Sequence, residues 1–169
     1  RKDAEFMTIC CELYGGSYPH DSVEKDKTAI KAQKHVYYHP SNRLFPFDLK
    51  VNGEFVDHDT FERLMEKAGF KVYGKALYRG SLQECMDHAN DFQTTIPAQF
   101  GLPTIEDNIV EGIVIKPVKP KFLNCGSRVI LKSKNKRFSE KSAKPKRVKV
   151  SAMTTLSDSA KELLLEAFQ

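Results

Sequence analysis

The sequence lacks an apolar run long enough to cross a membrane, and it lacks the residue spacings that bind zinc. No stretch in its 169 residues approaches the ~20 apolar residues that a membrane span requires, and no signal peptide is visible. The five histidines are scattered. Cysteine is scarce and shows no C-x-x-C pair; the four residues are Cys10, Cys11, Cys85 and Cys125. We therefore expect no membrane partner, no zinc site and reduced cysteines in the core.

What the chain does contain is an apolar content typical of a globular protein and an uneven excess of positive charge. Hydrophobic residues make up 40% of the sequence, and its length allows one domain with a substantial core. A formal net charge of +5 favours an anionic partner. Lysine and arginine are concentrated in residues 116–149, where Glu140 is the single acid. Such a run is either a solvated tail or a contact surface for a nucleic-acid backbone.

Two β-branched runs, Glu111–Pro117 and Arg128–Lys134, are typical of buried strands but carry charges. A charge buried without a partner is costly, so these charges need a polyanion or a metal to face. Alternation places Lys132 and Lys134 on one face of their strand, and Glu111 on the isoleucine face of the other. Two ammonium groups and a carboxylate at neighbouring strand ends predict a pocket for a nucleotide phosphate and its divalent cation.

The same two blocks resemble the E-G-x-V-[IL]-[KR] and K-x-[KR] signatures of the covalent nucleotidyltransferases, which comprise polynucleotide ligases and mRNA capping enzymes. Cys11–Tyr18 resembles the G-E-L-[FY]-G block of that family, and Leu44–Lys50 resembles its aromatic F-x-F-D-I block. Residues 76–85 and 96–103 are similar to segments of RNA-editing ligases rather than of DNA ligases. Over residues 6–140 the closer resemblance is to the second class of ATP-dependent RNA ligases, which contains a bacteriophage RNA ligase and the trypanosome mitochondrial editing ligases.

This resemblance implies an α+β fold, in which the antiparallel sheets of a nucleotidyltransferase (ATP-grasp-like ligase) domain, with flanking helices, enclose the nucleotide. It implies ATP as the donor of AMP, with Mg²⁺ or Mn²⁺ as the metal. Lys132 and Lys134 would lie at the α-phosphate, where cations offset the charge that builds as pyrophosphate leaves. Glu111 would complete the catalytic set as the metal carboxylate. The structural alternative is that both lysines are exposed on an edge strand, where they prevent aggregation.

Three further residues are expected, from the same resemblance, to bind the nucleotide. Glu12 would contact the ribose or a metal-bound water, since a carboxylate accepts hydroxyl hydrogens. Phe47 would stack on the adenine, because an aromatic face attracts any base. Lys116 would contact a phosphate or the RNA end. The structural alternatives are a salt-bridged strand-end carboxylate for Glu12 and a core position for Phe47.

The nucleophile of the family is absent from the sequence. In that family a lysine in a K-x-[DH]-G block, placed before the G-E-L-[FY]-G block, forms lysyl-AMP. Only eleven residues precede Glu12, and the chain starts at Arg1 without a methionine, so we expect a fragment whose nucleophile is upstream or lost. Lys71–Gly74 resembles the block in spelling, but it follows the aromatic block, where the family has a connecting strand. We therefore interpret it as structural.

The local patterns predict the following elements and domains. Strands are expected at Phe6–Leu13, as two strands within Val36–Val51, and at Phe70–Leu77. Helices are expected at Asp59–Ala68, at Ser81–Phe92 with a capping box, and at Ser157–Phe168. Residues 1–140 are expected to form a partial adenylyltransferase domain, and residues 141–169 a basic linker and the start of a helical C-terminal region.

The resulting prediction is an ATP-dependent RNA ligase that seals 3′-hydroxyl and 5′-phosphate ends through lysyl-AMP and RNA-adenylate. Its partners would be RNA ends in nicked or bridged duplexes, during RNA repair or editing, and this fragment alone would be inactive. The location would be intracellular, in mitochondrion, nucleus or cytoplasm. One alternative is a DNA ligase or capping-enzyme domain, which an OB-fold C-terminal domain would distinguish. Another is a non-catalytic basic RNA-binding module, which would not bind ATP.

Overall fold

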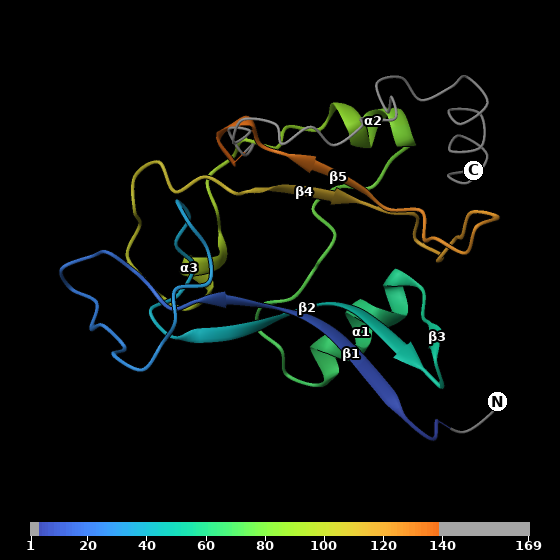
Figure 1. Cartoon of the computed structure of the whole chain (residues 1–169), viewed down its shortest axis with the longest axis horizontal. Coiled ribbons are helices and arrows are strands. Elements are labelled where there is room, and N and C mark those ends of the chain that lie inside the picture. The colour runs from blue at the N-terminus through green and yellow to red at the C-terminus, as the bar shows by residue number, and fades with distance from the viewer. Residues whose placement is uncertain (1–3, 139–169) are drawn as a thin grey trace, which may run out of the picture.

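The computed structural model describes residues 4–138, which form antiparallel strands and short helices (Figure 1). The strands are β1 (Met7–Gly15), β2 (Asn42–Val51), β3 (Glu54–Phe55), β4 (Gly112–Ile115) and β5 (Leu131–Lys134). The helices are α1 (His58–Lys67), α2 (Leu82–Asp87) and α3 (Ile96–Gln99), and a 3₁₀ turn, η1, follows at Lys136–Phe138. The expected basic linker and C-terminal helix lie outside the described residues.

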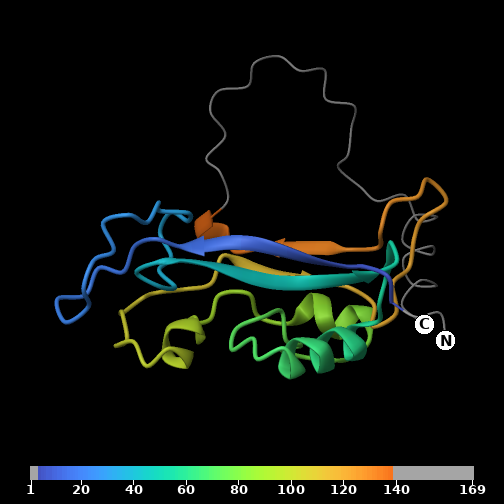
Figure 2. The ribbon, with the colours of Figure 1, turned by 90° about the horizontal axis from the view of Figure 1, so that it is seen from below.

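The strands form two antiparallel sheets, one with the order β1-β2-β3 and the other consisting of β4 and β5. All three α-helices lie on the same side of these strands (Figure 2). The expected α+β class, with antiparallel sheets and flanking helices, is confirmed. Within residues 4–138, no helix is both long enough and apolar enough to cross a membrane.

Helix α1 forms the main core with β2. Its apolar residues recur at helical spacing, so Phe61 and Met65 are buried against Leu49 of β2. Asp57 caps its N-terminus by accepting a hydrogen bond from the backbone N–H of Thr60 at 2.8 Å. The helix therefore begins and ends within one residue of the predicted bounds, and it fixes the position of the central strand.

The first of the two strands expected within Val36–Val51 is absent, because residues 36–41 do not pair with a strand. The backbone of Tyr37 is satisfied instead by the side chain of Asn108, which accepts from its N–H at 2.9 Å and donates to its carbonyl at 2.6 Å. The side-chain amide of Asn108 thus replaces the hydrogen bonds that a neighbouring strand would provide. The local sequence around Tyr37 does not indicate that Asn108 is its partner.

Two other elements differ from their predicted form. Phe70–Leu77 is not a strand, because its backbone N–H groups donate to scattered acceptors, such as the Pro46 carbonyl for Gly74 and the Glu62 carboxylate for Ala76. Helix α2 has the predicted capping box at Ser81, but it ends at Asp87. The chain beyond α2 is extended because residues 92–94 hydrogen-bond to residues 108–110.

The cysteines are free thiols, but they are not the core residues that we expected. Cys10, Cys11 and Cys85 are only partly buried, and Cys125 is exposed. Cys125 lies in the turn between β4 and β5, which is closed by a hydrogen bond from the Gly126 N–H to the Leu123 carbonyl at 2.8 Å. A turn of this kind lies at the surface whatever the polarity of its residues.

Candidate nucleotide-binding site

The pairing of β1 with β2 contains a β-bulge at Phe47. The adjacent β1 residues Cys10 and Cys11 pair with Asp48 and Pro46, so Phe47 is an extra residue without a direct partner. Bulges bend the strand and change the direction of a side chain, and they are frequent next to active sites. Phe47, the expected adenine-stacking residue, is 40% exposed. It is therefore not a core residue, and its ring is accessible to a ligand.

Asp48 lies at the centre of a mostly buried ion cluster. Its Oδ1 is 2.8 Å from Lys116 Nζ and its Oδ2 is 2.6 Å from Arg128 Nη1. The side chains of Asp48, Lys116 and Arg128 are only 8, 17 and 16% exposed. Burial alone would raise the pKa of Asp48, but hydrogen bonds from Arg128 and Lys116 outweigh burial and lower it. The cluster ties the middle of β2 to the segments that flank β4 and β5.

Lys116 also supports the bulge directly, because its Nζ donates to the Phe47 carbonyl at 2.9 Å. Its ammonium lies 5.6 Å from the centre of the Phe61 ring in α1. The contact of Lys116 with a phosphate or RNA end stays a prediction. Its observed partners give it a structural role in presenting Phe47.

Glu12 of β1 and Glu111, just before β4, lie within electrostatic range of each other. Burial raises the pKa of Glu111, repulsion from Glu12 raises it further, and Lys134 partly opposes this effect. The hydroxyl of Tyr38 lies beside the same pair, and burial and the two carboxylates raise its pKa. Glu12, Glu111 and Lys134, which are far apart in the sequence, are thus brought together by the fold.

Lys132 and Lys134 lie on one face of β5, as alternation predicted, opposite Val114 and Gly112 of β4. Both lysines are exposed. The other face of the pair is covered, since Ile115 is buried and the Asn90 side chain donates to Ser133. The lysine face is therefore available for an anionic ligand, although the edge-strand alternative also predicts its exposure.

Gly112 allows Glu111 to approach Lys134. A Cβ atom at Gly112 would lie 2.3 Å from the Ser133 carbonyl oxygen, so only glycine fits against β5 here. Its φ of 154° is unfavourable for other residues. The sequence pattern predicted that Glu111 lies inside a strand. In the structure it lies at a bend just before β4. Glu111 therefore lies in the bend that leads into β4, and Gly112 is the first residue of that strand and packs closely against β5.

The carboxylates fit the divalent cation that the sequence implied. Glu12 and Glu111 repel each other, and a cation between or beside them would relieve that repulsion. Within residues 4–138 no group of three or more His, Cys, Asp or Glu side chains could hold a metal alone. Mg²⁺ commonly binds through one or two carboxylates together with substrate phosphates, so this oxygen donor set is adequate only with a nucleotide present.

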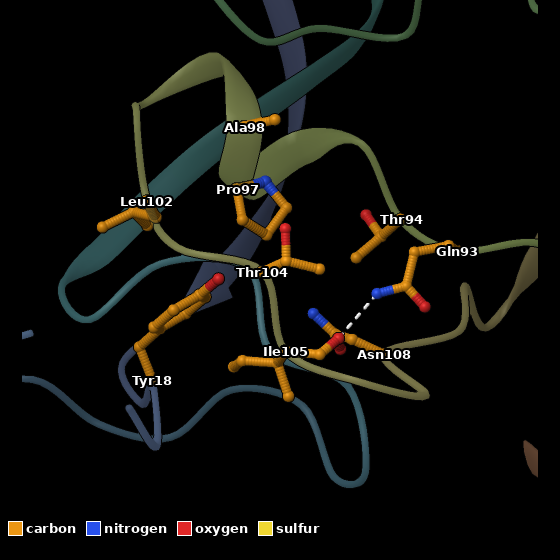
Figure 3. Close-up of a pocket in the computed structure, with 9 residues that line it drawn as sticks. All are labelled: Tyr18, Gln93, Thr94, Pro97, Ala98, Leu102, Thr104, Ile105 and Asn108. Atoms are coloured by element: carbon orange, nitrogen blue, oxygen red, sulfur yellow. Dashed lines mark hydrogen bonds between the residues drawn. The ribbon is translucent and has the colours of Figure 1, made fainter. Parts of the chain in front are cut away.

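A small cavity lies elsewhere, between α3 and the loop at residues 102–108 (Figure 3). Its volume of about 30 Å³ suits a water molecule, whereas ligand pockets usually measure about 300–1,000 Å³. Gln93 donates across this region to the Ile105 carbonyl at 2.7 Å, and Tyr18 donates to the Pro103 carbonyl. None of the predicted site residues lines this cavity. It belongs to the packing around the buried Tyr18 side chain.

Lys71, in the block that resembles the nucleophile motif only in spelling, is exposed and does not belong to a strand. In the same block the Tyr73 hydroxyl donates to Glu66 at 2.8 Å, and Gly74 packs against the backbone of Phe47. These contacts give the block a structural role as support for the bulge.

Three residues of the site were not singled out from the sequence: Asp48, Arg128 and Tyr38. Asp48 lies in the block Leu44–Lys50, and Arg128 lies in the run Arg128–Lys134. Each is a charged residue within an apolar segment, and the opposite signs of the two charges could have suggested that they pair. Tyr38 carries no signal, because its segment has no regular structure and its proximity to Glu111 depends on the fold.

Comparison with known proteins identifies the family. The model of the RNA ligase family matches residues 1–134, and the chain belongs to that family. This match selects RNA ligases over the DNA ligases and capping enzymes that the sequence blocks left open.

The mitochondrial RNA-editing ligase 1 of Trypanosoma brucei brucei is 31% identical over 133 residues, which cover 64% of this chain and 28% of the relative. The mitochondrial RNA-editing ligase 2 of the same organism is 26% identical over 137 residues, which cover 69% of this chain and 33% of the relative. The aligned region is thus a third or less of each relative.

Proposed function

We propose that this chain forms the nucleotide-binding part of an ATP-dependent RNA ligase with a nucleotidyltransferase fold. The observation that carries the proposal is the convergence of Glu12, Glu111 and Lys134 beside the exposed lysine face of β5. The ligase would join a 3′-hydroxyl to a 5′-phosphate through lysyl-AMP and RNA-adenylate. Membership in the RNA ligase family supports this reaction over that of a non-catalytic RNA-binding module.

In this proposal each residue acts on a different part of ATP. Lys132 and Lys134 offset the charge that grows on the α-phosphate while its bond to pyrophosphate breaks and a bond to the attacking lysine nitrogen forms. Phe47 holds the adenine by stacking. Glu12 accepts hydrogen bonds from the ribose, and Glu111 with Glu12 would hold Mg²⁺ or Mn²⁺, which supplies further positive charge at the phosphates.

The proposed substrates are RNA ends aligned in a nicked or bridged duplex, consistent with the RNA-editing ligases to which the chain is similar. Both relatives are named as mitochondrial proteins, and we extend that compartment to this chain as part of the proposal. Fluorescent tagging of the full-length protein tests it. A signal confined to the nucleus or cytoplasm would contradict this extension without affecting the proposed chemistry.

The 169-residue chain should bind ATP but should not become covalently labelled by α-labelled ATP and magnesium. No K-x-[DH]-G block occurs in this sequence, and Lys71 has a structural setting. Gel analysis of the labelled protein, beside calorimetric titration of ATP, measures both properties. Absence of ATP binding by the folded chain would favour the RNA-binding module.

The Lys71→Ala variant is the control for that experiment. If the wild-type chain acquires AMP and Lys71→Ala does not, Lys71 is the nucleophile and our interpretation of its block is wrong. A longer protein that contains a K-x-[DH]-G block should be labelled whether or not Lys71 is present.

Phe47→Ala should weaken ATP binding about tenfold, because stacking of one base on an aromatic ring contributes about 1–3 kcal/mol. Phe47→Tyr should retain most of the affinity, since the ring is kept. The matched control is Phe6→Ala, which removes a ring that is also exposed but lies immediately before β1. Calorimetry with ATP measures the three affinities. Equal losses in Phe47→Ala and Phe6→Ala would remove the support for stacking.

A further inference from the structure

The connection between β4 and β5 ends in an ordered hairpin tip, which we define as residues 118–128. Its arms are paired through the bridge between Phe122 and Arg128 and through the hydrogen bond from the Val129 N–H to the Lys121 carbonyl at 2.9 Å. The turn is closed at Leu123, and Gly126 adopts a φ of 80°, which suits a short hairpin loop. The side chains of the tip are therefore presented by a preorganised backbone.

The tip exposes an aromatic ring next to a second ring that is already bound by cations. Phe122 is 54% exposed, and its ring centre lies 6.5 Å from that of Phe55 in β3. The Arg128 guanidinium lies 3.8 Å from the Phe55 centre, and Lys50 Nζ lies 4.5 Å from it. Cations thus already contact Phe55, while Phe122 stays accessible to solvent.

The sequence on both sides of this ring is rich in positive charge. Between residues 112 and 134 the sequence has no acid, and its bases are Lys116, Lys119, Lys121, Arg128, Lys132 and Lys134. The nearest acid on the neighbouring strand is the exposed Glu54, while Asp48 is already neutralised by two cations. Exposed aromatic rings among cations are typical of surfaces that bind single-stranded nucleic acid. Protein interfaces, in contrast, are depleted of lysine.

We propose that the hairpin tip binds an unpaired segment of the RNA substrate, with a base stacked on Phe122 and a phosphate beside Lys119. This inference rests on the proposed function, and it adds a substrate contact outside the nucleotide site. Arg128, at the base of the tip, is held by Asp48 next to Phe47. An RNA strand bound at the tip would therefore pass close to the place where the adenylate is expected.

The test is the affinity of the 169-residue chain for a short fluorescein-labelled single-stranded RNA, measured by fluorescence anisotropy at several salt concentrations. Phe122→Ala should weaken binding about tenfold, as expected for the loss of one stacked base. Phe122→Tyr should retain the wild-type affinity. Lys119→Ala should reduce the slope of log affinity against log salt by about 0.7, the value for one phosphate contact on a single strand.

Matched controls lie in the irregular segment between β1 and β2. Ile30→Ala removes an exposed apolar side chain, and Lys25→Ala removes an exposed charge, so neither should change the affinity or the salt slope. Wild-type affinity in Phe122→Ala and Lys119→Ala overturns the inference, and so does a wild-type chain that binds no RNA. Loss of self-association in Phe122→Ala, with RNA binding intact, would show that the tip is a protein interface and would also overturn it.

ATP titration of the same variants separates this inference from the proposed function. Phe122→Ala should bind ATP like the wild type, because Phe122 is not part of the nucleotide site. If the chain binds no ATP but RNA affinity depends on Phe122, the ligase proposal fails and the RNA surface stands. If the chain binds ATP and its RNA affinity is independent of Phe122, the proposal for the hairpin tip is wrong, and the ligase proposal is unaffected.

Discussion

Asp48→Asn is expected to lower the free energy of unfolding by about 3–5 kcal/mol, the usual cost of removing one partner from a buried ion pair. Asparagine keeps the shape of the side chain but leaves the Lys116 and Arg128 cations, both mostly buried, without a counter-charge. Urea denaturation followed by circular dichroism measures the loss. Because Lys116 also holds the Phe47 carbonyl, ATP affinity should fall in the same variant.

The matched control for Asp48→Asn is Lys75→Gln, which removes one charge from an exposed ion pair with Glu66. Exposed pairs contribute little, so this variant should stay within about 0.5 kcal/mol of the wild type. A similarly small change in Asp48→Asn would contradict the structural importance of the cluster.

The pH dependence of the Asp48 effect has a definite sign. The pKa of Asp48 is lower in the folded protein than its ordinary value of 3.8, so its ionised form stabilises the fold. This contribution is fully present above that value and is lost as pH falls through the lowered pKa. The stability gap between wild type and Asp48→Asn should therefore be constant near neutral pH and should close in acid.

The Asp48 cluster also explains what the sequence could not predict. Regular alternation along β2 would place Asp48 on the face opposite Phe45 and Glu12. The bulge at Phe47 inserts one residue, so Asp48 shares a face with Glu12. A bulge depends on how two strands pair, and that information is not contained in either strand alone.

Elements whose stability is local were predicted well. Helix α1 follows from its apolar spacing and its Asp57 cap, and the start of α2 follows from the capping box at Ser81. The lysine face of β5 follows from alternation. Segments whose backbone is satisfied by distant groups were not predicted, as in the bonds between Tyr37 and Asn108, because sequence patterns report only local partners.

The grouping of Glu12, Glu111 and Lys134 is an intermediate case. Their membership in separate blocks predicted a shared pocket, and the fold brings them within electrostatic range. Gly112 packs closely against β5, and this packing permits the approach. The sequence shows only that a glycine follows Glu111 in the block, and it does not show the packing. The roles of these residues toward ATP and metal stay predictions.

Glu111→Gln is expected to abolish most adenylylation while leaving the protein as stable as the wild type, or more stable, at neutral pH. Burial and repulsion from Glu12 raise the pKa of Glu111 in the folded state, so its ionised form opposes folding. Glutamine removes that penalty and keeps the shape. Loss of one electrostatic contact to the reacting phosphates typically reduces the rate about 100-fold or more. Labelling by α-labelled ATP in a longer protein that contains the nucleophile, together with thermal unfolding, measures both effects.

The sign of the stability difference in Glu111→Gln is opposite to that in Asp48→Asn. The wild-type penalty is absent when Glu111 is protonated, and it grows as pH rises from the ordinary value of 4.5 through the raised pKa of the folded state. Glu111→Gln should therefore gain stability relative to the wild type over that window and keep the gain at neutral pH. Glu106→Gln, at an exposed loop carboxylate, is the control and should change neither stability nor labelling. A parallel loss of stability and labelling in Glu111→Gln would show that Glu111 supports the fold rather than the chemistry.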